Sequence, residues 1–188
     1  MKLLSIAIPC YNSEAYMEKC IESLLKGGEE VEILVVNDGS SDRTAEIADT
    51  YAEKYPTIIK AIHQENGGHG EAVNAGIRNA TGLYFKVVDS DDWVNEEAYK
   101  QILKKLEELT RGPQTLDMLI SNFVYEKQGA SRKKVMQYRH CLPVNENFWM
   151  GQCAYVKRQI SVDAFYYLSY KTASRMWIGT AEAYILCG

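Results

Sequence analysis

Continuous apolar runs alternate with segments of helical periodicity through the first 120 residues of the chain. Short apolar runs rich in Val, Ile and Leu predict buried strands over residues 3–8, 31–36, 57–62, 83–88 and 116–120. Between them, apolar residues recur at helical spacing and predict helices over residues 16–25, 45–52, 71–79 and 95–109. Strands that are apolar along their whole length belong to sheets covered on both faces. The alternation therefore predicts an α/β fold with a Rossmann-like, mostly parallel sheet between helices.

Polar loops follow the first four predicted strands. They cover residues 9–14, 37–42, 63–70 and 89–93. The carboxyl ends of parallel strands meet at one edge of a sheet, which is where open α/β folds bind their ligands. We expect the functional site at this edge, and we expect Asn12 or Ser13 to cap the first helix.

The pattern decays after about residue 126. Residues 127–134 are polar and basic, and residues after Glu146 show neither strand nor helix periodicity. We therefore divide the chain into a core over residues 1–125 and an irregular tail over residues 126–188.

Composition narrows the function classes. The chain has 188 residues, of which 46% are hydrophobic and 24% charged, and its net charge of -4 argues against a nucleic-acid binder that relies on phosphate contacts. No apolar run is long enough to span a bilayer, and the apolar start, Met1–Pro9, is too short for a signal peptide. The five cysteines are scattered, which indicates reduced thiols in a cytoplasmic protein.

The acidic run after the fourth predicted strand is the most informative stretch. Asp89, Asp91 and Asp92 crowd into four positions, and carboxylates that close repel one another unless a cation lies among them. Mg²⁺ or Mn²⁺, shared with a substrate phosphate, suits such oxygen ligands. The alternative is an acidic turn that caps the following helix.

Four loop sequences, taken in order and spacing, resemble those of family 2 glycosyltransferases with the GT-A fold. They are Ile8–Glu14, Val36–Asp42, Asn66–Gly68 and Asp89–Asp92. The resemblance covers about residues 2–125. It implies an inverting transfer of a sugar from a nucleoside diphosphate donor, often a UDP-sugar, to a carbohydrate or lipid-linked acceptor. Bacterial relatives commonly build cell-surface polysaccharides, so the intact enzyme could associate with the inner face of the membrane.

The resemblance assigns roles to individual loop residues. The donor-binding set is Pro9, Tyr11, Glu14, Asp38, Asn66, Gly67, Asp89 and Ser90. Tyr11 can stack on the nucleobase, Pro9 shapes the turn before it, and Asp38 can accept a base N–H. Asp89 faces the ribose or the metal, and Asp91 ligates the metal that bridges the diphosphate.

Local explanations compete with several of these roles. Tyr11 suits ordinary loop packing, and Asp38 suits an Asx-turn or a helix cap. Glu14 could hold the first loop, or be favoured in the first turn of a helix by the helix dipole. Asp92 could support the metal ligands or cap the next helix, and Trp93 fits packing better than substrate stacking.

The chain departs from the family pattern at two places. Val73 stands where a basic residue often precedes Asn-Ala-Gly; His69 could compensate, or have no role. The family's general base comes from beyond the fifth strand, and no motif surrounds the acidic residues there, Asp163 and Glu182. The catalytic residue therefore stays unassigned.

The tail suggests a reason. Residues 180–188 can be back-translated to a DNA sequence that, read one nucleotide later, encodes Leu-Pro-Lys-His-Thr-Phe-Tyr-Val and begins a codon that fits Asp, giving Leu-Pro-Lys-His-Thr-Phe-Tyr-Val-Asp. That string resembles the acceptor-side segment of relatives, so we hypothesise a shifted reading frame that starts between about Glu146 and Thr180 and ends early. Resequencing the gene tests this, and an intact frame through a genuine stop would contradict it.

Three alternatives to an active transferase stay open. The first is an inactive donor-binding fragment of such an enzyme. A sugar nucleotidyltransferase would need a Gly-rich, basic loop after the first strand, where Pro9–Asn12 stands. A dinucleotide-binding oxidoreductase would need GxGxxG there, but the Gly cluster 67–70 follows the third strand.

Overall fold

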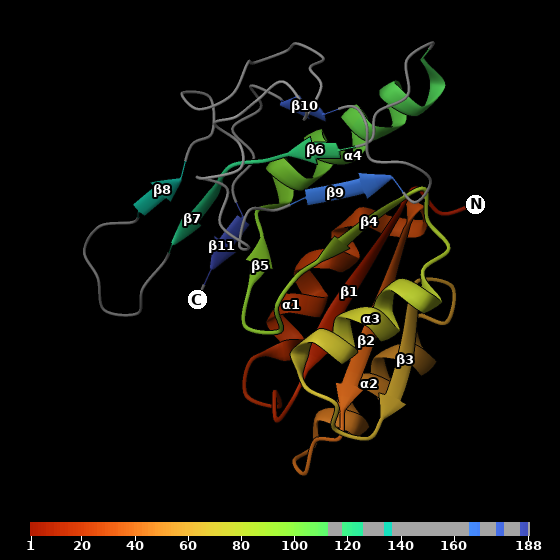
Figure 1. Ribbon diagram of the computed structural model, residues 1–188, viewed down its shortest axis with the longest axis vertical. Helices are drawn as coiled ribbons and strands as arrows, with labels where there is room; N and C mark the ends of the chain where they lie inside the picture. Colours follow the sequence, from red (N-terminus) through yellow and green to blue (C-terminus); the bar gives the residue numbers. More distant parts are fainter. Residues whose placement is uncertain (113–117, 126–133, 137–165, 170–175, 179–184, 188) are drawn as a thin grey trace.

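The computed structural model describes residues 1–112, 118–125, 134–136, 166–169, 176–178 and 185–187. The four strands at its centre are β1 (Leu4–Cys10), β2 (Val31–Asp38), β3 (Ile59–Gln64) and β4 (Tyr84–Val87). They are parallel, with β2 and β4 on either side of β1 and β3 beyond β2 (Figure 1). The predicted mostly parallel α/β sheet is confirmed.

Helices cover both faces of this sheet (Figure 1). They are α1 (Met17–Leu24), α2 (Thr44–Lys54), α3 (His69–Asn79) and α4 (Glu96–Arg111), and the 3-10 helix η1 (Leu25–Glu30) follows α1. Buried residues of α1, α2 and α4 share one core with β1 and β2, whereas α3 packs on the other face against Val36. Right-handed crossovers account for the opposite placement of α3 relative to α1 and α2, because the chain reverses direction across the sheet between β3 and β4.

The main core lies between β1 and α1. Leu4, Ile6 and Ile8 alternate along the strand, and Met17 and Ile21 face them from the helix, all at most 1% exposed. Burial of each such side chain contributes about 1.5–3 kcal/mol. On the other face α3 packs closely on β1. The contact is so close that a Cβ added at Gly76 would lie 2.5 Å from the Ala7 Cβ, so the position requires glycine. The loops at the ends of these elements therefore start from a rigid base.

Two helix starts differ from the expected ones. Tyr16 is the N-cap residue of α1 and makes no side-chain cap. Ser13 instead uses its backbone oxygen, which accepts from the amides of Tyr16 and Met17, and its hydroxyl bonds elsewhere. Asn95, not Asp92, caps α4, with its side-chain oxygen 3.0 Å from the Ala98 amide.

Strand limits also shift. The third strand was expected over 57–62 and begins at Ile59, because the amides of Ile58 and Ile59 bond to the Tyr55 oxygen in a turn that continues from α2. Pro9, expected in a turn, lies buried inside β1 opposite Val36.

The remaining strands extend this sheet and form a second one. They are β5 (Trp93–Val94), β6 (Met118–Ile120), β7 (Phe123–Tyr125), β8 (Lys134–Met136), β9 (Tyr166–Ser169), β10 (Met176–Ile178) and β11 (Ile185–Cys187). The sheet orders are β10-β6-β9-β4-β1-β2-β3 and β5-β11-β7-β8. The predicted fifth strand is β6, and its first two expected residues lie outside the described part.

The tail, expected to be irregular, supplies β8, β9, β10 and β11, all short. Asp163 and Glu182 lie outside the described residues, as does most of the segment assigned to the frame shift. Among the described helices, none combines the length and the apolar character needed to cross a bilayer.

Candidate functional site

The strand order creates a switch point between β1 and β4. The chain adds β2 and β3 on one side of β1 and then returns to place β4 on the other. The loops after β1 and β4 lead to helices α1 and α4 on the same face of the sheet, and they lie at its carboxyl edge, the usual binding position in open α/β folds. The loops after β2 and β3 leave from the same carboxyl edge (Figure 1). All four loops predicted to meet do so.

Asp38 joins the second loop to the third. It ends β2 and is 2% exposed. Its Oδ1 accepts from Gln64 Nε2 at 2.7 Å and from the Gly67 amide at 2.8 Å, and its Oδ2 accepts from the Gly68 amide at 2.8 Å. Burial alone would raise the pKa of Asp38, but these hydrogen bonds outweigh it and hold the pKa below its ordinary value.

These bonds change how the Asn-Gly-Gly loop is explained. The sequence placed Asn66 and Gly67 in the donor-binding set, yet the Gly67 and Gly68 amides donate to Asp38. Gly39, the next residue after Asp38, has φ +67°, and a Cβ there would lie 2.7 Å from the Asn66 amide nitrogen. The Asp-Gly and Asn-Gly-Gly motifs therefore fit each other, and Asn66 remains exposed at the rim.

The first loop is bonded to the second along its length. Asn12, in the left-handed region at φ 50°, accepts from the Ser41 amide at 2.9 Å, and its own amide donates to Ser40 Oγ at 3.0 Å. Tyr11, just before it, is 55% exposed. The backbone is thus held while the Tyr11 ring stays accessible, which suits stacking on a flat ligand.

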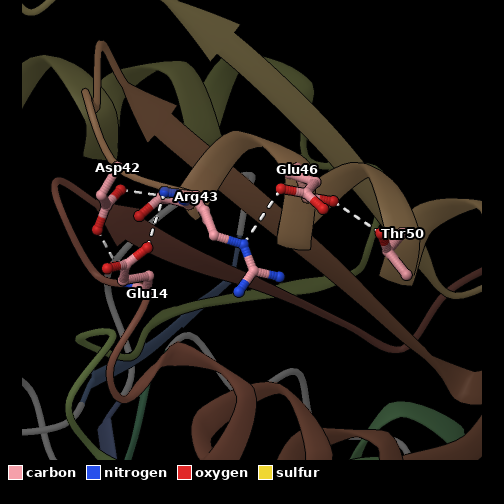
Figure 2. Close-up of polar contacts among 6 residues, drawn as sticks. Glu14, Asp42, Arg43, Glu46 and Thr50 are labelled. Atoms are coloured by element: carbon pink, nitrogen blue, oxygen red, sulfur yellow. Dashed lines mark hydrogen bonds and ion pairs between the residues drawn. The ribbon is translucent and has the colours of Figure 1, made fainter.

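Glu14 holds two loops together, as one of the alternatives proposed. Its amide donates to Asp42 Oδ2 at 3.0 Å, and its Oε2 accepts from the Arg43 amide at 3.0 Å (Figure 2). Asp42 Oδ1 also accepts from the Thr44 amide at the start of α2. Burial raises the pKa of Asp42, but bonds from Thr44 and from the Glu14 amide lower it by more. The carboxylates of Glu14 and Asp42 therefore accept hydrogen bonds from backbone amides and stabilise the two loops.

The acidic loop alternates between exposed and buried residues. Asp89 and Asp91 are exposed, whereas Ser90 and Asp92 are each 8% exposed. A turn bond from the Asp92 amide to the Asp89 oxygen, 2.9 Å long, sets this alternation. The outward pair matches the two expected metal ligands, and Asp92 faces inward. Trp93 packs under the Lys19 ammonium, 3.0 Å from its ring centroid, as expected of a packing residue.

The carboxylate oxygens of the acidic loop could coordinate a hard cation, provided that a bound ligand supplies further oxygens. Asp89 and Asp91 offer carboxylate oxygens, which Mg²⁺ and Mn²⁺ prefer. Within the described residues, however, no three His, Cys, Asp or Glu side chains gather into a complete metal site. A cation here would need further oxygens from a bound ligand, as Mg²⁺ sites commonly do.

Three further features occur at the site: the free thiols were predicted from the sequence, whereas the contacts of His69 and of Ser13 with Ser90 were not. His69, at the start of α3, lies with its Nε2 4.0 Å from Asp89 Oδ1, so the imidazole is placed beside the acidic loop. The hydroxyls of Ser13 and Ser90 meet beneath the loops. Cys10 and Cys20 are free thiols, and burial is the main cause that raises the pKa of Cys10 to about 12. Only the position of Ser13 and Ser90 inside their motifs could have signalled such a contact.

Comparison with known proteins relates the chain to a family of glycosyltransferases. The family model described as glycosyl transferase family 2 matches residues 5–163. Glycosyltransferase GlyG of Streptococcus pneumoniae is 36% identical over 124 residues, which is 65% of this chain and 39% of that protein. The uncharacterized glycosyltransferase EpsJ of Bacillus subtilis is 43% identical over 107 residues, or 56% of this chain and 31% of that protein. The chain thus spans about a third of the length of these relatives.

Solved structures agree. S. aureus TarS in complex with UDP-GlcNAc is 30% identical, with a TM-score of 0.53 over 73% of this chain and 37% of that one. A complex of TarS with UDP gives 29% identity and a TM-score of 0.54. The mannosyltransferase PcManGT of Pyrobaculum calidifontis, 22% identical with a TM-score of 0.53, shares the fold.

Proposed function

The chain belongs to glycosyl transferase family 2, and we propose that it binds a nucleoside diphosphate sugar, specifically a UDP-sugar, at the carboxyl edge of β1 and β4. The observation that carries this proposal is the convergence of all four family loops at one sheet edge: Asp38, Asn12 and Glu14 interlock the first three, and the Ser13–Ser90 contact joins the acidic loop to them. Support for a uridine nucleotide comes from TarS, whose complexes contain UDP and UDP-GlcNAc.

The donor would lie along this edge of the sheet, from Tyr11 to Asp91. Tyr11 presents its exposed ring to the base. Asp38 remains close by; a carboxylate can accept about four hydrogen bonds and Asp38 already accepts three, so one acceptor position on Oδ2 could take a base N–H. Asp89 and Asp91 lie beside the other end of the donor. Pro9 and Glu14 contribute by fixing the first loop.

Asp89 and Asp91 would hold Mg²⁺ or Mn²⁺ together with the diphosphate. Such an ion neutralises the negative charge that builds on a departing nucleoside diphosphate. The exposure of both carboxylates on one short loop supports this part of the proposal. The same loop also carries the backbone that would approach the ribose.

Transfer to an acceptor is the larger proposal. Inversion needs a general base near the acceptor hydroxyl. Asp163 and Glu182 lie outside the described residues. We propose that the intact enzyme transfers the sugar to a carbohydrate or lipid-linked hydroxyl at the cytoplasmic face of a membrane, in polysaccharide synthesis. A chain that binds the donor without transferring it is the second candidate, because this chain spans about a third of its relatives. The family match removes support from a sugar nucleotidyltransferase.

Thermal stabilisation by nucleotides tests the donor site. A ligand at 100 times its Kd adds about 2.7 kcal/mol to stability. For a domain of this size that corresponds to a rise in Tm of roughly 5–10 °C. We expect such a rise with UDP and Mn²⁺, a smaller one with other nucleoside diphosphates, and loss of the Mn²⁺-dependent part in Asp91→Asn.

A matched variant controls for charge. Glu53→Gln removes the same charge from an exposed position near the far end of α2 and should behave as the unchanged protein. No rise with UDP and Mn²⁺, or an equal rise in Asp91→Asn, would refute the donor-site assignment. Transfer of labelled sugar to any acceptor, beyond hydrolysis of the donor, separates an active transferase from a donor-binding protein.

A further inference from the structure

Two serine hydroxyls form a buried link between the first loop and the acidic loop. Ser13 is 1% exposed at the end of the first loop, and Ser90 is 8% exposed in the middle of the acidic loop. Their Oγ atoms are 2.9 Å apart, although the residues are separated by 77 positions in the chain. A short bond between two small, buried hydroxyls fixes the relative position of the two backbones.

Ser13 is itself firmly held. Its amide donates to Thr44 Oγ1 at 2.8 Å, and Thr44 is fully buried at the start of α2. Its backbone oxygen accepts from Tyr16 at 3.1 Å and from Met17 at 3.0 Å. The hydroxyl of Ser13 therefore projects from a position that is fixed by both α1 and α2.

The acidic loop is fastened to the same unit on its inner side. The Cys20 thiol lies 3.6 Å from the Asp89 oxygen, and the Val94 amide donates to Ser23 Oγ at 3.1 Å. Both partners belong to α1, which continues directly from the first loop. Ser90 lies between these two points and faces inward, while its neighbours Asp89 and Asp91 are exposed. The Ser13–Ser90 bond thus joins the loop of Tyr11 to the loop of the carboxylates, and both hydroxyls also bond with the buried Cys10 thiol.

We propose that Ser13 and Ser90 are a positioning pair that couples nucleotide binding to metal binding; this rests on the donor site proposed above. The pair keeps the carboxylates of Asp89 and Asp91 close to the position that the diphosphate would occupy when the base of the nucleotide stacks on Tyr11. Without it, the acidic loop occupies the competent position for a smaller fraction of the time, and apparent affinity falls in proportion to that fraction. The loss appears only when the metal contributes to binding.

Calorimetric titration of UDP with and without Mn²⁺ measures this coupling. The readout is the ratio of the UDP Kd without Mn²⁺ to the Kd with Mn²⁺, which is the linkage between the two ligands. Ser13→Ala and Ser90→Ala should each lower this ratio about fivefold or more, near the lower end of typical coupling. The metal-free Kd should change by less than about twofold. The double variant should lower the ratio no further, since each change removes the same bond.

Ser5→Ala is the matched control. Ser5 is also fully buried in β1, but its hydroxyl bonds to Glu32 and to the Gly82 amide at the opposite end of the strand. This variant should lose stability and keep the wild-type ratio. A merely structural effect of losing a buried hydroxyl would instead lower the ratio in all three variants, which would overturn the proposal.

The outcomes are distinguishable. If the unchanged protein shows no linkage between UDP and Mn²⁺, the donor-site proposal fails and the coupling fails with it. If the linkage is present and Ser13→Ala and Ser90→Ala retain it, only the positioning role is refuted. Should Ser13→Ala fail to fold, Ser90→Ala, at the less buried position, decides the question.

Discussion

Asp38→Asn tests the interlocking of the loops. The substitution keeps the shape of the side chain but replaces one carboxylate oxygen with an NH₂ group. The three groups that donate to Asp38 are Gln64 Nε2 and the amides of Gly67 and Gly68. At least one of them would then face another donor. A hydrogen bond to a charged group contributes about 1.5–3 kcal/mol, so we expect a loss of about 1.5–3 kcal/mol in the free energy of unfolding.

Urea titration at pH 7 measures this loss. Asp91→Asn is the control, because it makes the same chemical change at an exposed position and should stay within about 0.5 kcal/mol of the unchanged protein. If Asp38→Asn were as stable as Asp91→Asn, the carboxylate would not be holding the third loop, and the explanation of both glycine motifs would fail.

The pH dependence gives a second readout. The pKa of Asp38 is lowered in the folded state, so its contribution is present above the unfolded pKa of about 4 and is lost as pH falls through the lower folded value. The stability difference between the unchanged protein and Asp38→Asn should therefore stay constant from pH 7 to about 5. It should then shrink in stronger acid. A difference that grows toward acid would contradict this reasoning.

Three further substitutions test other parts of the structure. Gly39→Ala should cost about 2 kcal/mol or more, read from chemical denaturation, because φ is +67° and the new Cβ would lie 2.7 Å from the Asn66 amide nitrogen. Tyr11→Ala should weaken UDP binding by about 1–3 kcal/mol in calorimetry while Tyr11→Phe does not, since stacking needs only the ring; equal affinities of the two variants would contradict it. Ile21→Ala, in the fully buried core, should cost about 2–5 kcal/mol in urea titration, and Ile77→Ala, at a position 40% exposed, far less.

Hydrophobic pattern carried most of the fold prediction. Strands that are apolar on both faces have few alternatives to a covered parallel sheet, and their order in the chain places every polar loop at a known edge. The first and last residues of the strands were less predictable. The third strand begins two residues later than its apolar run, because the turn after α2 uses the amides of Ile58 and Ile59.

Roles within the loops needed the tertiary structure. Glu14, Asp38 and Gly67 looked like ligand contacts in the sequence, and the structure shows each bonded to another loop. A motif marks residues that occur together but does not distinguish a residue that contacts a ligand from one that supports its neighbour. The tertiary structure also distinguishes the residues of the acidic run. Asp89 and Asp91 are exposed and Asp92 is buried, in a turn closed by the bond from the Asp92 amide to the Asp89 oxygen.

The sequence by itself determined the fold class, the family and the sheet edge at which the four loops gather, because strand periodicity and loop order are local properties of the chain. Only the tertiary structure decided which side chains connect the loops. The Ser13–Ser90 contact joins positions 77 residues apart, and such a contact depends on how β1 and β4 lie beside each other. Parallel neighbours are set by long-range packing, which no local pattern encodes.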